Sequence, residues 1–148
     1  MAKLETFLSP AQVLADMRAL DKPRLLTDLS ALAADALSLK PDDVSRIVMA
    51  REALGSTGLG HGIGLPHARL EAIAKPFCIL ARLKRPIEFD AVDGQPVDLV
   101  VFILLPSATP DENLNTLATI ARQLRDPQRL KRMRRAADAQ ALFHEMLA

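Results

Sequence analysis

The sequence predicts a single α/β domain in which helices flank a mixed β-sheet on both sides. Apolar residues recur at helical spacing near both ends of the chain, and two apolar runs of strand length lie in the middle. Helices and strands do not alternate regularly, so we expect parallel and antiparallel pairs in one sheet. The chain has 148 residues, of which 49% are hydrophobic, and this suits one domain spanning residues 1–148.

The N-terminal part is predicted to contain a short helix, a short strand and a longer helix. Ser9-Pro10 is typical of a helix start with proline in the first turn, and residues 14–20 are predicted to form the strand. Asp21 and Pro23 precede a helical pattern that ends at Lys40-Pro41. The predicted inward face of this helix comprises Leu25, Leu26, Leu29, Leu32, Ala33, Ala36 and Leu37.

A second helix is predicted directly after this break. Asp42 and Asp43 fall in its first turn, where the helix dipole favours carboxylates. The helix is expected to run to about Leu54, and Gly55 is expected to end it. The residues expected to face inward are Val44, Ile47, Val48 and Leu54.

The centre of the chain predicts the strands of the sheet. Residues 77–83 form a short apolar run, and residues 97–105 form a stronger one, which indicates a strand covered on both faces. Asp93-Gly94 is a turn signal just before the second run. A helix is expected over residues 111–125. Its predicted inward residues are Leu114, Leu117, Ala118, Ala121 and Leu124.

The C-terminal part carries many cations. Pro127 is predicted to begin a basic helix, and Asp138 is predicted to cap a last helix that ends at Leu147 and carries His144 on its surface. These cations would form either a docking surface for an acidic partner or a solvated helix face, and we favour the second. No aromatic residues interleave with them, so nucleic acid is not an expected partner. The cations are Arg122, Arg125, Arg129, Lys131, Arg132, Arg134 and Arg135.

Composition gives weaker indications of where the protein works. The single cysteine, Cys78, lies in a predicted core strand and cannot form an internal disulfide, which fits a reducing cytoplasm. The longest strongly apolar run, residues 99–105, is far shorter than the roughly 20 residues needed to span a bilayer. The first residues do not resemble a signal peptide. A cytoplasmic location without membrane insertion is therefore expected.

A glycine-rich segment is the most informative part of the chain. Five of the six glycines lie between Gly55 and Gly64, shortly before Pro66-His67. Glycine allows positive φ, so such a loop can direct N–H groups toward an anion, and Ser56 and Thr57 add hydroxyl donors. The alternative is a flexible surface loop or hairpin.

The histidine after the loop suggests the chemistry. A neutral imidazole nitrogen is a competent phosphoryl acceptor at physiological pH, so the segment predicts phosphoryl transfer to His67. Arg51 and Arg69 are the basic candidates for stabilising the charge of a phosphoryl group there.

Several other site types lack the residues they require. There is no lysine for a nucleotide-binding P-loop, and the glycines do not follow a G-x-G-x-x-G pattern. Three histidines and one cysteine show no spacing typical of a zinc site, and no G-x-S-x-G serine motif is present. We therefore expect no metal and no cofactor.

Three stretches together point to a family. Residues 51–60, REALGSTGLG, residues 62–67, GIGLPH, and residues 86–99, PIEFDAVDGQPVDL, closely resemble the active-site region of enzyme IIA of the bacterial phosphoenolpyruvate phosphotransferase system. The resemblance is to the fructose/mannitol class, type 2, and is strongest to its nitrogen-regulatory branch. It covers nearly the whole chain, and a long motif of this kind is far more specific than a glycine pattern alone.

The resemblance implies a fold, a site and partners. It implies a mixed sheet between helices and a histidine, His67 here, that is transiently phosphorylated on Nε2 by a small HPr-like phosphocarrier. Arg51 would neutralise the phosphoryl group, and Ser56 and Thr57 would line the site. Phosphorylation would control regulated target proteins such as kinases or transporters. The chain would then be a phosphotransferase component rather than a stand-alone enzyme.

One part of the chain departs from the family pattern. Family members commonly carry a second histidine, in a His-Leu-x-x-Leu pattern, early in the helix after the long core strand. Residues 111–117, DENLNTL, have asparagines there, and we assign Asn115 to the second-histidine position. An amide can donate a hydrogen bond to a phosphoryl oxygen but cannot become cationic. His61 is a candidate local substitute, although a solvated loop histidine is the favoured interpretation.

Three functions are carried forward from the sequence. The first is a phosphoryl-carrier regulator in which the phosphorylation state of His67 selects partner proteins. The second is a sugar-specific enzyme IIA that passes the phosphoryl group to a IIB domain, which the lack of a fused IIB segment disfavours. The third is a protein-binding module that is not phosphorylated, suggested by Asn115.

Overall fold

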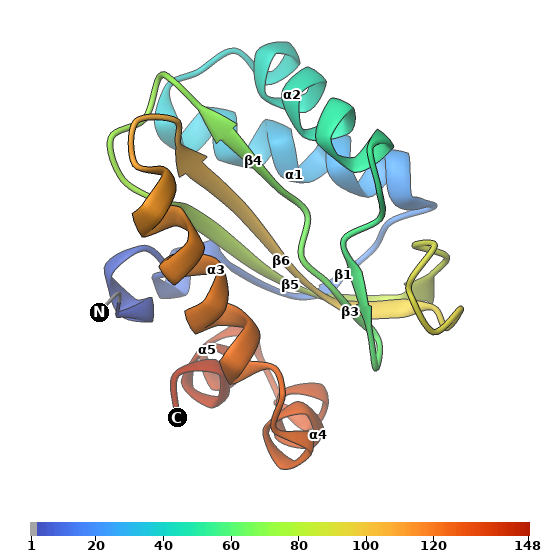
Figure 1. Ribbon diagram of the computed structural model, residues 1–148. Coiled ribbons are helices and arrows are strands. Elements are labelled where there is room, and N and C mark those ends of the chain that lie inside the picture. Colours follow the sequence, from blue (N-terminus) through green and yellow to red (C-terminus); the bar gives the residue numbers. More distant parts are fainter. Residues whose placement is uncertain (1–2) are drawn as a thin grey trace.

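The computed structural model describes residues 3–148 and contains one six-stranded sheet with helices on both faces (Figure 1). The first two residues of the predicted 1–148 domain lie outside the described residues. The strands are β1 (Val13–Met17), β2 (Gly58–Gly60), β3 (Ile63–Gly64), β4 (His67–Leu70), β5 (Phe77–Ile87) and β6 (Val97–Pro106). The helices are α1 (Lys22–Leu37), α2 (Pro41–Ala53), α3 (Pro110–Gln123), α4 (Pro127–Arg135) and α5 (Ala139–Leu147), with short 3-10 turns η1 (Leu4–Thr6) and η2 (Pro10–Gln12).

The sheet is mixed, as the sequence predicts. Its strand order is β1-β5-β6-β3-β2, and β4 also pairs with β6. The long strands β5 and β6 are antiparallel, whereas β1 runs parallel to β5, and both β3 and β4 run parallel to β6. Strand β6 is therefore the centre of the sheet, and β4 begins beside it at the pair His67 and Ile103.

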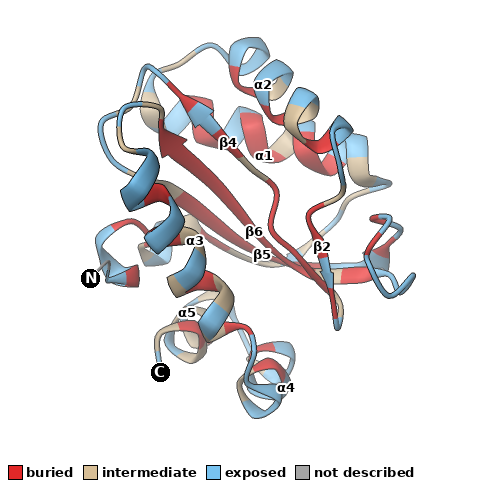
Figure 2. Ribbon diagram, in the orientation of Figure 1, coloured by how far each residue is buried: buried red, intermediate tan, exposed pale blue. Residues whose placement is uncertain are grey.

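The sheet separates two hydrophobic cores. Alternating residues of β6 point to opposite faces, so Phe102 packs under α1 and α2, whereas Ile103 packs under α3, α4 and α5. Both faces of this strand are buried, whereas the helices that cover the sheet are exposed on their outer sides (Figure 2). The prediction of helices on both sides is confirmed.

Local signals correctly place most helix ends. Asp21 accepts a hydrogen bond of 2.9 Å from the Arg24 backbone N–H at the start of α1, and Asp138 accepts one of 2.8 Å from Ala141 at the start of α5. The helix predicted at Ser9-Pro10 is a single 3-10 turn. None of the helices in the described part of the chain combines the length and apolar character needed to cross a membrane.

The predicted inward faces are wrong at several positions. Leu32 and Ala36 are exposed because they lie outside the stripe of α1 that packs against the core. Ile47 is 36% exposed, and Leu54 is 85% exposed because it lies beyond the end of α2, where helical spacing no longer applies. In α3, the exposed residues Leu114 and Ala118 were predicted to face inward. The buried residues of that helix are Asn113, Thr116 and Ile120.

A buried arginine secures the C-terminal helices to the sheet. Arg82 on β5 donates hydrogen bonds of 3.0 Å and 2.7 Å to the carbonyl oxygens of Met133 and Ala136 at the end of α4. These carbonyls are at a helix C-terminus, where a cation is favourable. Cys78 is fully buried in the same strand, as expected, and burial strongly raises the pKa of its thiol.

Candidate functional site

His67 is the first residue of β4 and is only partly buried. Its Nδ1 lies 2.8 Å from the carbonyl oxygen of Leu65. A carbonyl oxygen can only accept, so Nδ1 carries the proton in this contact. In the neutral ring, Nε2 then holds the lone pair, and the backbone itself selects the nitrogen that can act as a nucleophile.

The surroundings of His67 favour the neutral ring. Burial is the largest influence and lowers the pKa of His67 below the ordinary value of 6.5. The contact with the Leu65 carbonyl and the charge of Glu52 act in the opposite direction, whereas Arg51 and Arg69 lower the pKa further. Because the net shift is downward, the structure favours the neutral ring more than solvent does.

Four of the five predicted site residues line one shallow depression of about 340 Å³. They come from the end of α2, the glycine-rich segment and the start of β4, and helix α3 closes the opposite side. The lining residues are Arg51, Ser56, Thr57, Leu59, Leu65, His67, Leu117, Ala118 and Ala121.

Arg51 is the cation of this depression. It lies in the last turn of α2, and its Nη1 donates a hydrogen bond of 3.0 Å to the carbonyl oxygen of Gly55. This bond uses one of the five N–H donors of the guanidinium group. The remaining donors are chemically suited to the oxygens of a phosphoryl group on His67.

Ser56 and Thr57 shape the wall of the depression through bonds within the protein. The Ser56 hydroxyl donates a hydrogen bond of 2.7 Å to the Phe89 carbonyl oxygen, and the Thr57 hydroxyl donates one of 2.7 Å to Glu52. Both hydroxyl protons are therefore used within the protein and are not directed toward the open depression.

The glycine-rich segment is an ordered hairpin, β2 to β3, and not an open anion cradle. Several of its backbone N–H groups already have partners: Thr57 donates to Glu52 at 2.8 Å, Gly58 to the Ser56 hydroxyl at 3.1 Å, and His61 to Asp93 at 3.0 Å. Positive φ angles occur at the turn, including 95° at Gly60. The hairpin alternative therefore describes this segment, and glycine allows its tight turn.

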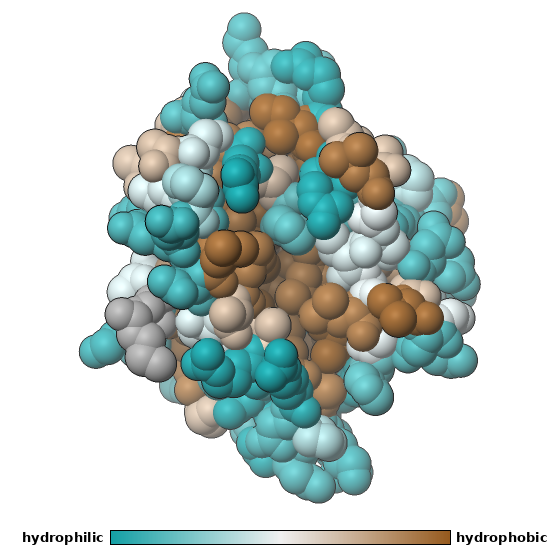
Figure 3. All heavy atoms as spheres, in the orientation of Figure 1, coloured by the Kyte–Doolittle hydropathy of each residue, from teal (hydrophilic) through white to brown (hydrophobic). Residues whose placement is uncertain are grey.

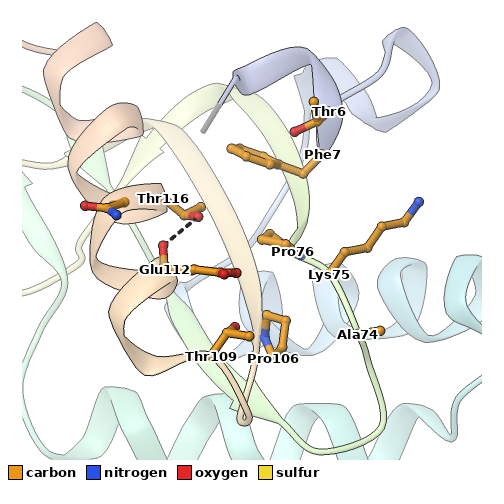
Figure 4. Close-up of a pocket in the computed structure, with 10 residues that line it drawn as sticks. Thr6, Phe7, Ala74, Lys75, Pro76, Pro106, Thr109, Glu112 and Thr116 are labelled. Atoms are coloured by element: carbon orange, nitrogen blue, oxygen red, sulfur yellow. Dashed lines mark hydrogen bonds between the residues drawn. The ribbon is translucent and has the colours of Figure 1, made fainter. Parts of the chain in front are cut away.

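Asn115 does not join this site. It lines a different depression of about 340 Å³, formed between α3 and the N-terminal segment. Figure 4 shows Glu112 and Thr116 of α3 facing Phe7 and Pro76 across this second depression.

Asn113 fits the second-histidine position better than Asn115 does. The leucines of the His-Leu-x-x-Leu pattern match Leu114 and Leu117, which places the histidine on Asn113. Asn113 is 1% exposed, and its amide nitrogen donates to the carbonyl oxygen of Pro106 at 2.8 Å. The sequence analysis missed this residue, although the register of the two leucines identifies it.

Glu52 is the second residue that the sequence analysis missed. Its side chain is buried and contacts Lys22 and Thr57 directly behind the depression. The adjacent Arg51-Glu52 pair in the motif was the available signal.

His61 lies outside the His67 depression. It lines, together with Leu59, Ala121 and Arg125, a neighbouring depression that continues along α3. His61 does not line the depression that contains His67. The structure therefore separates the two histidines, and a solvated loop histidine remains the better description.

Part of the C-terminal basic cluster serves to hold helices in place. Arg134 pairs with Asp98 at 2.9 Å, and Arg132 pairs with Glu145 at 2.7 Å. Others in the cluster, including Arg122 and Lys131, are exposed, as is His144 on α5. The exposed members fit the favoured interpretation of a solvated helix face, and the ion pairs of Arg132 and Arg134 are an additional structural role.

The fold and the site together define a class of protein: an α/β domain that presents a neutral, Nδ1-protonated histidine beside an arginine. The sequence profile of the family described as "Phosphoenolpyruvate-dependent sugar phosphotransferase system, EIIA 2" matches residues 6–148. The chain belongs to this family.

Individual relatives are similar over almost the full length of the chain. A nitrogen regulatory protein of Bradyrhizobium diazoefficiens is 39% identical over 136 residues, which cover 92% of this chain and 89% of that protein. One of Pseudomonas aeruginosa is 38% identical over 144 residues, 97% of this chain and 94% of that protein. The crystal structure of the nitrogen regulatory protein IIA-Ntr from Neisseria meningitidis superimposes with a TM-score of 0.90 at 30% identity, covering 95% of this chain and 97% of that one.

Proposed function

We propose that this protein is a phosphoryl-carrier regulator of the nitrogen-regulatory type, with residues 1–148 acting as one domain. His67 accepts a phosphoryl group on Nε2 from an HPr-like phosphocarrier, and its phosphorylation state controls which target proteins are bound. The observation that carries the proposal is the 2.8 Å contact between His67 Nδ1 and the Leu65 carbonyl oxygen, which leaves the lone pair on Nε2 of a residue that shares its depression with Arg51.

The transfer step requires little from the protein beyond positioning and charge stabilisation. The Nε2 lone pair forms a bond to phosphorus while the bond between phosphorus and the carrier's side chain breaks, and the leaving atom keeps that electron pair. The proton stays on Nδ1, where the Leu65 carbonyl accepts its hydrogen bond. The guanidinium group of Arg51 balances the negative charge that arrives with the phosphoryl oxygens.

An apolar rim beside His67 suits docking of the phosphocarrier. Leu59 is 48% exposed, and Leu117 of α3 lines the His67 depression. Leu114, one turn before Leu117 on α3, is 63% exposed. Figure 3 shows hydrophobic side chains gathered along the hollow between α3 and the β2–β3 hairpin. Exposed apolar residues that surround a polar centre are typical of protein contact sites.

Phosphorylation would change the same surface that partners contact. A phosphoryl group adds nearly two negative charges and strong acceptor oxygens to the depression beside the apolar rim. Targets such as kinases or transporters would then bind one of the two forms in preference. The fully buried and unpaired Cys78 is compatible with the reducing cytoplasm in which we propose that the protein works.

Phosphoryl transfer in a purified system tests this proposal. The protein is mixed with phosphoenolpyruvate, the first enzyme of the relay and an HPr-like carrier, and intact mass is recorded. A gain of about 80 Da, one phosphoryl group, is expected in the wild type and not in His67→Ala. A labelled His67→Ala would show that the acceptor lies elsewhere.

The same assay distinguishes the alternatives. A wild-type protein that never gains the mass would favour the binding module that is not phosphorylated. Rapid onward transfer to a sugar-specific IIB domain would favour a role in carbohydrate uptake. For the regulatory role, partner capture should differ between His67→Ala and His67→Asp, which crudely mimics the added charge.

A further inference from the structure

A buried carboxylate lies directly behind the His67 depression. The side chain of Glu52 is 6% exposed and forms a salt bridge of 2.7 Å with Lys22. Its two oxygens also accept hydrogen bonds from Thr57, one of 2.8 Å from the backbone N–H and one of 2.7 Å from the hydroxyl. A buried charge is tolerated only with such compensation, and removing one partner is costly. Lys22 and Thr57 therefore supply the partners that the buried carboxylate of Glu52 requires.

Lys22 fixes this carboxylate from the start of α1. Its Nζ also donates a hydrogen bond of 3.0 Å to the Phe89 carbonyl oxygen and lies 4.3 Å from the centre of the Phe89 ring. The Ser56 hydroxyl donates to the same carbonyl oxygen at 2.7 Å. Helices α1 and α2, the start of the hairpin and the segment after β5 therefore meet at one group of polar contacts.

Hydrogen bonds continue from this group to His67. The carbonyl oxygen of Thr57 accepts a bond of 3.0 Å from the Leu65 N–H. The carbonyl oxygen of Leu65 then accepts the Nδ1–H of His67 at 2.8 Å. Glu52 thus holds Thr57, Thr57 holds Leu65, and Leu65 sets the tautomer and orientation of the His67 ring.

We propose that Glu52 is a positioning residue for phosphoryl transfer, which acts through Thr57 and Leu65 to hold the His67 ring with Nε2 ready to accept. This inference rests on the proposed function. Glu52 does not touch the reacting atoms. Its effect is geometric, because a shift of about 1 Å in a reacting group can lower a rate roughly 100-fold.

The decisive variant separates positioning from stability. In Lys22→Met/Glu52→Met both charges are replaced by apolar side chains, a change that is often neutral or stabilising for a buried ion pair. The variant keeps a filled interior but loses both bonds to Thr57. Thr57→Val removes only the hydroxyl bond, and Thr57→Ser restores a hydroxyl. Glu71→Gln is the control, because it removes one carboxylate from an exposed position.

Two readouts are needed for each variant. The first is the initial rate of phosphoryl gain from the HPr-like carrier. The second is the ¹⁵N spectrum of the His67 ring, which reports the protonated nitrogen in the unphosphorylated protein. We expect the double variant to unfold cooperatively, to accept phosphoryl groups roughly 10- to 100-fold more slowly, and to show mixed tautomers. Thr57→Val should show a smaller loss that Thr57→Ser recovers, and Glu71→Gln should match the wild type.

The proposal is overturned if the double variant keeps the wild-type rate and spectrum. It is also overturned if the rate falls while the spectrum stays unchanged, because the loss then arises elsewhere. If the double variant does not fold, Thr57→Val decides by the same criteria. If even the wild type gains no phosphoryl group, the proposed function fails, and the ¹⁵N spectra alone then support or overturn the positioning role.

Discussion

The side-chain amide of Asn113 donates a hydrogen bond of 2.8 Å to the carbonyl oxygen of Pro106 at the end of β6. Its own oxygen accepts a bond of 3.1 Å from the Thr109 hydroxyl. The amide nitrogen therefore attaches the first turn of α3 to the central strand, and the amide oxygen holds Thr109, the residue directly before the helix. The residue at the second-histidine position of the family pattern is a structural link in this chain.

This link predicts that replacing Asn113 destabilises the protein more than replacing the nearby Asn115. Asn113→Ala leaves the Pro106 carbonyl oxygen without its side-chain donor in a buried place, so unfolding should become easier by about 1–3 kcal/mol. Asn115→Ala, at an exposed position, should change the free energy of unfolding by less than about 0.5 kcal/mol. Urea unfolding of both variants measures the difference, and equal effects would contradict the structural role of Asn113.

The lowered pKa of His67 predicts how phosphoryl acceptance depends on pH. Only the neutral ring has a lone pair on Nε2, so the rate should rise with pH and level off above a midpoint that lies below 6.5. The ¹⁵N titration of His67 should show the same midpoint. The phosphocarrier used must donate at a rate that does not change over this pH range, because otherwise the measured pH dependence would reflect the donor and not His67.

The same shift has a consequence for stability. Between the folded pKa and 6.5 the unfolded chain binds more protons at His67 than the folded chain does, so stability must fall as pH decreases through this window. His67→Gln, which does not titrate, should reduce this dependence in urea unfolding. A steeper pH dependence in His67→Gln would show that the direction of the shift is wrong.

The position of Arg51 predicts that replacing it slows phosphoryl gain while His67 remains the acceptor. Arg51→Gln removes the cation from the depression, and the phosphoryl gain of His67 should slow roughly 100- to 1,000-fold, as when one preorganised donor is removed from an active site. The control is Arg46→Gln on the same helix, because Arg46 is exposed and forms a surface ion pair of 3.3 Å with Asp43. Equal rates of phosphoryl gain in the two variants would contradict a role of Arg51 in the transfer.

The sequence was sufficient for the architecture because local signals and apolar runs are both strong here. Asp138 caps α5 as predicted, Asp21 lies just before α1 as predicted and caps it, and β5 and β6 begin where the two apolar runs begin. The inward face of α3 was not predictable from periodicity, since Leu114 and Ala118 are apolar and share helical spacing but remain exposed, and Ala118 lines the His67 depression. Periodicity identifies an apolar face but not whether the core or a partner covers it.

The sequence identified several residues of the site, but it did not predict the hydrogen bonds between them. The motif placed Arg51 and His67 in one depression, but it did not show that Glu52 takes up the donors of Thr57. Hydrogen-bond partners depend on how α2 and the hairpin meet in space, which spacing along the chain does not encode. The predicted anion cradle was wrong for this reason, since the N–H groups of Thr57 and Gly58 are used within the protein.

Two glycines in and just before the hairpin should differ in how well they tolerate a methyl group. A Cβ on Gly58 would lie 2.7 Å from the Cα of Ala91, a backbone atom that cannot move aside cheaply. The Val92 N–H donates a bond of 3.2 Å to the Gly58 carbonyl oxygen, so the two segments are also tied together. Gly58→Ala should therefore lower the free energy of unfolding by about 1–3 kcal/mol through overpacking.

Gly55→Ala is the matched control, because a Cβ at Gly55 meets no atom within 4 Å. Its effect on the free energy of unfolding should stay within about 0.5 kcal/mol. Gly58→Ala should also slow phosphoryl gain, since the displaced segment carries Phe89, whose carbonyl oxygen accepts bonds from both Ser56 and Lys22. A stable Gly58→Ala with an unchanged rate would mean that the segment at Ala91 yields without disturbing the site, and the close approach would then have no role in holding His67.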